Sequence, residues 1–180
     1  MTAMKDNSLQ RWLVSWLEQC LLRRAPQDDA ASSAGLRGAV LAYLVVDLLQ
    51  ALAGADWSVA VGMSFLDTAV MVLFCWLLLT IVNRSARFVQ TLTALAGTGA
   101  LLGLLGLPLM WQAGGVQQGD APGAALVSGW LLLLVWNVAV QAHIFRHALS
   151  SRYATGVLVA GLHTVVAITL LSYFFPQTAG

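Results

Sequence analysis

Five long apolar runs, separated by short polar connections, constrain this chain more than any other feature of its sequence. Each run is about long enough to cross a hydrocarbon core of roughly 30 Å as a helix. Backbone amides in lipid must find partners within their own segment, so a helix is the structure we expect for each run. The predicted spans are Arg37–Gly54, Trp57–Val82, Phe88–Met110, Gly123–His143 and Ala154–Phe175.

The composition supports an all-α, polytopic membrane protein with the lipid bilayer as its main partner. Hydrophobic residues make up 59% of the 180 residues, and charged residues only 9%. A soluble domain carries about 25% charged residues, so these charges are too few to cover a globule in water. The net charge of +1 and the lack of a basic tract argue against a nucleic-acid partner.

An amphipathic helix is predicted over residues 8–24, before the first span. Its apolar residues recur at helical spacing and include Trp12 and Trp16. Because the segment is too short and too charged to span, we expect an interfacial helix with both tryptophans among the headgroups. Packing against the chain's own helices or a partner is the alternative. The predicted organisation is a cytoplasmic N-terminal segment (residues 1–34), a five-helix transmembrane domain (residues 35–175) and a short outside tail (residues 176–180).

The distribution of basic residues predicts the orientation of the chain. Every lysine and arginine lies before or at the start of the first span, after the second span, or after the fourth span. The intervening connections and the C-terminal tail carry none. By the positive-inside rule, we expect a multi-pass protein of the inner (cytoplasmic) membrane, with its N-terminus in the cytoplasm and its C-terminus outside.

Three ionisable residues lie near the middle of predicted spans: Asp47 in the first, Asp67 in the second and His163 in the fifth. A charge at the bilayer centre costs at least about 2.5–3.5 kcal/mol, so these side chains should face protein or water. They form either a proton or cation relay or a hydrogen-bond network that only fixes helix packing. Asn137 and Gln141, one turn apart in the fourth span, are expected to join this polar network.

Glycines in the third span predict a helix-packing surface, formed by Gly97, Gly99 and Gly103. The spacing of Gly99 and Gly103 is the small-xxx-small pattern that lets two helix backbones approach closely. The pattern leaves open whether the neighbouring helix belongs to the same chain or to a second copy.

Signatures of enzymes and metal sites are missing from the sequence. His143 and His147 share a helix face and would form half of a metal site, but no Cys, Asp or Glu follows nearby to complete it. No H-E-x-x-H or G-x-S-x-G motif occurs. The two membrane aspartates lack the Gly-x-Gly-Asp context of intramembrane aspartyl proteases. We therefore expect a protein without enzymatic activity, metal or cofactor.

The layout resembles the bacterial branch of the Yip1 family of small five-span membrane proteins over about residues 35–175. An amphipathic segment precedes the first span. The third run begins Arg-Phe-Val-Gln-Thr-Leu-Thr-Ala-Leu-Ala-Gly, and the fourth ends Trp-Asn-Val-Ala-Val-Gln-Ala-His-Ile-Phe-Arg-His-Ala-Leu. The Asp-Leu-Tyr-Gly-Pro-like motif of the eukaryotic members is missing, so the resemblance implies architecture rather than a trafficking activity.

Two functions follow as expectations from these features. The first is a non-enzymatic membrane scaffold or assembly protein of the Yip1-like type, acting as a homo-oligomer or with other membrane proteins. The alternative is a small transporter or channel subunit that uses Asp47, Asp67 and His163 as a proton or cation relay. A water-filled path that reaches these three residues would favour the transporter, and a dry, closed bundle with an exposed apolar or glycine-rich face would favour the scaffold.

Overall fold

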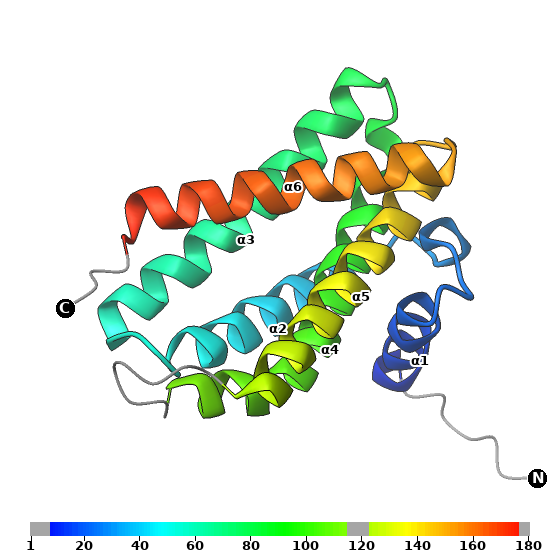
Figure 1. Cartoon of the computed structure of the whole chain (residues 1–180). Helices are drawn as coiled ribbons and strands as arrows, with labels where there is room; N and C mark the ends of the chain where they lie inside the picture. The colour runs from blue at the N-terminus through cyan, green and yellow to red at the C-terminus, as the bar shows by residue number, and fades with distance from the viewer. Residues whose placement is uncertain (1–7, 115–122, 177–180) are drawn as a thin grey trace, which may run out of the picture.

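The computed structural model of the chain describes residues 8–114 and 123–176, and these residues form helices joined by turns (Figure 1). Five of the helices are long and apolar enough to cross a membrane, as the sequence predicts. No strand occurs in the described ranges. Most of the predicted tail and part of the loop before the fourth span lie outside them. The elements are α1 (Ser8–Cys20), the short 3-10 helix η1 (Pro26–Asp28), α2 (Ser33–Ala51), α3 (Trp57–Ile81), the 3-10 helix η2 (Ser85–Arg87), α4 (Phe88–Gly114), α5 (Ala124–Ala148) and α6 (Tyr153–Phe174).

The five long helices form one bundle with α4 near its centre. Helix α2 packs along α4, α5 packs along both α4 and α6, and α3 contacts α2 and α6. Figure 1 shows α3 and α6 crossing on one side of the bundle, with α2, α4 and α5 on the other. Helices α2, α4 and α6 begin at one end, which we call the basic end because Arg37, Arg84, Arg87, Arg146 and Arg152 lie there.

Two helices extend beyond their predicted limits at the basic end. Helix α2 begins at Ser33 rather than Arg37, because the Ser32 side chain caps it by accepting a hydrogen bond from the Gly35 amide at 3.2 Å. Helix α5 continues past His143 to Ala148. The Arg87 guanidinium donates to the carbonyls of His147 and Ala148, at 2.9 Å each, and thereby satisfies the last turn.

The bundle is tightly packed toward the basic end and open toward the opposite end. Cys75, Leu79, Ile144 and Phe145 are completely buried and belong to one core cluster. In contrast, the first half of α5 is exposed on several sides, and Leu132 has 68% of its surface exposed. The interior between α2, α4 and α5 is therefore accessible only in the half of the bundle away from the arginines.

Helix α1 packs on the outside of α4 through the face that carries its tryptophans. Trp16 is only 6% exposed, and its ring occupies the space that a Cβ atom on Gly97 would need. Trp12 covers Gly35, whose missing Cβ would lie 3.3 Å from the ring. The Trp136 indole donates to the Cys20 carbonyl at 2.9 Å. The two tryptophans thus contact the chain's own helices, the alternative that the sequence left open.

The side of α1 that faces away from the bundle is also apolar. Leu13 is 38% exposed, and Leu17 and Leu21 are 52% exposed each. Arg11 and Arg23 are also exposed and flank this side of the helix. An interfacial position of α1 remains a prediction, and the leucines rather than the tryptophans are the residues available to contact lipid.

Candidate functional site

Two of the three midplane residues, Asp47 and Asp67, lie together between α2 and α3. The Tyr43 hydroxyl donates a hydrogen bond to Oδ2 of Asp67 and so joins the two helices. Asp47 lies one turn further along α2 than Tyr43, and Ser64 lies about one turn before Asp67 on α3. The Ser64 hydroxyl donates to the Ala60 carbonyl at 2.9 Å. Helical spacing places Tyr43 and Asp47 on one face of α2, as the sequence predicts.

His163, the third midplane residue, belongs to a neighbouring hydrogen-bond chain between α5 and α6. Its Nδ1–H donates to Oε1 of Gln141 at 2.8 Å, and the Gln141 amide donates to Oδ1 of Asn137. The Phe74 ring lies 5.0 Å from the imidazole, so the polar group is enclosed by apolar side chains. The structure thus brings Asn137 and Gln141 to His163, whereas the two aspartates form a separate group with Tyr43.

The predicted packing glycines make room for side chains of the same chain. A Cβ atom on Gly99 would lie 2.6 Å from the Tyr43 ring, and one on Gly103 would lie 2.7 Å from the Val46 side chain. The Gln50 amide fixes this contact further by donating to the Gly103 carbonyl at 2.6 Å. Gly97 faces Trp16 of α1 in the same way. The glycine surface of α4 is therefore covered by α1 and α2 within the monomer.

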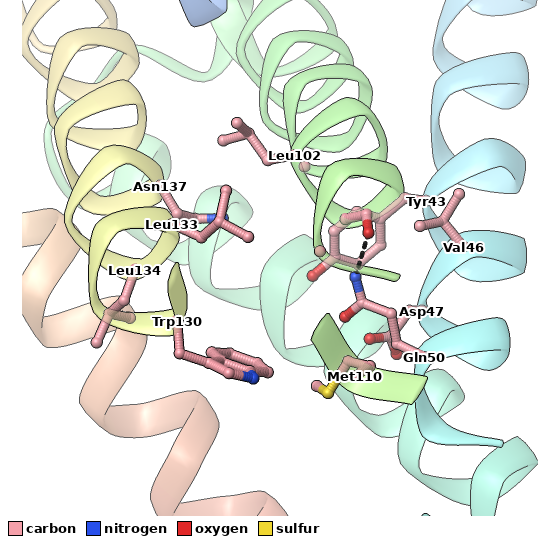
Figure 2. Close-up of a pocket in the computed structure, with 13 residues that line it drawn as sticks. Tyr43, Val46, Asp47, Gln50, Leu102, Met110, Trp130, Leu133, Leu134 and Asn137 are labelled. Carbon is pink, nitrogen blue, oxygen red and sulfur yellow. Dashed lines mark hydrogen bonds between the residues drawn. The ribbon is translucent and has the colours of Figure 1, made fainter. Parts of the chain in front are cut away.

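A mainly apolar cavity of about 160 Å³ with a few polar lining residues lies between α2, α4 and α5 in the open half of the bundle (Figure 2). Asp47 and Tyr43 line it from α2, and Asn137 lines it from α5. A separate, smaller cavity of about 30 Å³ is lined by Gln141 and His163 and shares Tyr43 and Asn137 with the larger one. Each hydrogen-bonded group thus lines a cavity, and the two cavities are neighbours. Toward the basic end, the completely buried core of Cys75, Leu79 and Phe145 closes the interior.

A second polar cluster, centred on Asp29, escaped the sequence analysis. Its carboxylate accepts hydrogen bonds from Ser15 and, at 2.7 Å, from Gln19, and it pairs with Arg24 at 2.9 Å. Its backbone carbonyl accepts from the Gln90 amide at 2.6 Å. A hydrogen bond with Glu18 raises the pKa of Arg24 above its ordinary value. This cluster fastens α1 to the start of α4.

The two histidines at the end of α5 lie side by side, with ring centroids 4.6 Å apart. Nε2 of His143 donates to the Arg24 carbonyl at 3.1 Å, which fixes the turn after α1. Within residues 8–114 and 123–176, no group of three or more His, Cys, Asp or Glu side chains is arranged to hold a metal ion. The observed role of His143 is thus a contact with the α1 region.

The fold and the cavity define a class of protein: a helical, multi-pass membrane protein with polar residues inside its bundle. No protein-family model, curated protein or solved structure matches this chain. The resemblance to the Yip1 family therefore stays a prediction from the sequence.

Proposed function

We propose that this protein is a non-enzymatic membrane transporter, or a subunit of one, that takes up a proton or a small cation at Asp47 and Asp67. The supporting observation is the cavity of about 160 Å³, which is lined by Asp47 and by Tyr43, the hydrogen-bond donor to Asp67. Two neighbouring carboxylates in a poorly polar environment repel each other when both are ionised. A bound proton or cation relieves this repulsion, which gives the pair a reason to bind one.

The buried core between the cavity and the basic end determines what kind of transport is compatible with this fold. A channel needs a continuous path, whereas the interior here ends at Cys75, Leu79 and Phe145. The proposal is therefore a carrier whose binding site opens to one side at a time. Movement of the first half of α5 would open and close the site. This half is exposed and has few neighbours, whereas the second half is packed against α6.

Gradient measurements in vesicles containing the purified protein test this function. We expect wild-type protein to dissipate an imposed gradient of pH or of a small monovalent cation. The exchange should slow by at least about tenfold in Asp47→Asn and in Asp67→Asn, because an amide keeps hydrogen bonds but cannot exchange a proton. Both variants should fold, since the amide also removes the cost of an intramembrane charge.

Asp56→Asn is the matched control, because Asp56 is exposed, precedes α3 near the same end of the bundle and does not line the cavity. It should exchange ions like the wild type. If the Asn variants of Asp47 and Asp67 are as active as the wild type, the polar residues serve only in helix packing. If vesicles with the wild-type protein dissipate the gradient no faster than empty vesicles, the transport proposal is wrong.

The second candidate is a membrane scaffold of the Yip1-like type. It is favoured by the close docking of α1, which leaves Leu13, Leu17 and Leu21 exposed on one side. A scaffold should retain its oligomeric state and its co-purifying membrane proteins in Asp47→Asn and Asp67→Asn. It should lose them when these three leucines are replaced by Ser, a change that leaves the docked face of α1 intact.

We also propose that the basic end faces the cytoplasm and that the cavity opens toward the outside. The support is the concentration of arginines at one end of the bundle. Reporter fusions after Arg87 and Arg152 should report a cytoplasmic location, and fusions after Gly115 and at Gly180 an outside location. A cytoplasmic reporter at Gly180 would contradict this orientation.

A further inference from the structure

We infer that the occupant of the cavity is a small organic ammonium cation, held by Asp47 and by the ring of Trp130. This inference rests on the proposed function and names the substrate class of the same site. It starts from the size of the space. About 160 Å³ is comparable with the engineered cavity of roughly 150 Å³ that binds benzene. A proton or a bare inorganic cation leaves most of such a space unfilled.

The oxygen atoms around the cavity are too few for an inorganic cation. Asp47 is the acidic residue that lines it. The Tyr43 hydroxyl is engaged with Asp67, and Oδ1 of Asn137 accepts from Gln141. Gln50, whose amide nitrogen donates to the Gly103 carbonyl, adds one side-chain oxygen to the lining. Hard cations such as Mg²⁺ and Ca²⁺ take about six or more oxygen ligands. One carboxylate and one amide oxygen instead match a single positive charge whose other contacts are mainly apolar.

The walls of the cavity supply those apolar contacts. Figure 2 shows the Trp130 ring reaching from α5 toward the side where Asp47, Gln50 and Met110 lie. An indole face attracts alkylammonium groups more strongly than other aromatic rings, and a thioether adapts to irregular shapes. Trp130 is 36% exposed, so part of its side chain is accessible. A carboxylate and an indole in the lining of one mainly apolar cavity are a combination that suits an organic ammonium ion.

Titration calorimetry on the full-length protein in detergent, with tetramethylammonium as the probe and ionic strength held constant, tests the inference. We expect saturable binding that sodium at the same concentration does not displace. Asp47→Asn should weaken binding by at least about tenfold, because the counter-charge is lost. Trp130→Leu, which keeps the carboxylate, should weaken it by about three- to thirtyfold, as loss of a cation–π contact predicts.

Trp111→Leu is the matched control, because Trp111 lies near the same end of the bundle, is 62% exposed and does not line this cavity. It should bind the probe like the wild type. Absence of saturable binding, displacement by equimolar sodium, or wild-type affinity in both Asp47→Asn and Trp130→Leu would overturn the inference.

The vesicle experiment separates this inference from the proposed function. Gradient dissipation that depends on Asp47, without tetramethylammonium binding, would leave the proposed function intact and overturn the ammonium specificity. Binding with the expected pattern of variants, without any gradient dissipation, would support the ligand class and overturn transport.

Discussion

Replacing Gly156 with alanine should lower the free energy of unfolding by about 2–3 kcal/mol, because α5 and α6 approach most closely at this residue. The added methyl group would overlap the Ala142 carbonyl oxygen and lie 3.1 Å from Cβ of Arg146. A backbone carbonyl inside a helix cannot rotate away, so the two helices must separate. Thermal unfolding in detergent should show a midpoint lower by about 5–10 °C.

Gly161→Ala provides the comparison within the same helix. No atom lies within 4 Å of the position that its Cβ would occupy, and alanine is favoured over glycine in helices by about 1 kcal/mol. This variant should be as stable as the wild type or slightly more stable. Equal midpoints for Gly156→Ala and Gly161→Ala would show that α5 and α6 are further apart than described.

Replacing Trp16 with alanine should have the second large effect, detaching α1 from the bundle. A buried tryptophan replaced by alanine typically costs about 3–5 kcal/mol, and the ring of Trp16 fills the space over Gly97. The reactivity of Cys20 reports this detachment, because burial raises the pKa of its thiol to about 11. Exposure restores an ordinary thiol pKa of about 8.5, so alkylation at pH 8 should accelerate roughly a hundredfold or more.

The alkylation experiment requires that Cys20 be the sole thiol, so Cys75 is first replaced by alanine. The chain has two cysteines, and Cys75 is buried in α3. Trp57→Ala serves as the control, since Trp57 is 65% exposed at the opposite end of the bundle. Its alkylation rate should match that of the parent. Slow alkylation of Cys20 in Trp16→Ala would mean that contacts other than the ring hold α1 in place.

The number and type of the helices were predictable because apolar runs of this length permit only one structure in lipid. The extent of α5 was not, because the polar residues after Gln141 suggested that the span ends at His143. In the structure, His143 is 3% exposed and donates to the Arg24 carbonyl. A polar side chain that finds its partner in a distant segment is indistinguishable, in the sequence, from one that faces water.

Only part of the candidate site was predictable, because its contacts also join distant segments. Periodicity along α2 placed Tyr43 and Asp47 on one face, but the bond between Tyr43 and Asp67 depends on how α2 and α3 pack together. The Asp29 cluster was missed because residues in a predicted loop have no periodicity to interpret. Its available signal was the spacing of Ser15 and Gln19, four residues apart on the side of α1 that carries Trp16.

The docking of α1 also implies an order of events during synthesis. The carbonyl of Cys20 accepts its hydrogen bond from Trp136, which is 116 residues further along the chain. At 5–20 residues per second, the ribosome needs on the order of 10 s to make that interval. Helix α1 therefore leaves the ribosome well before the last part of its binding surface, on α5, exists. Until then lipid or a chaperone must cover the apolar residues that this part will bury.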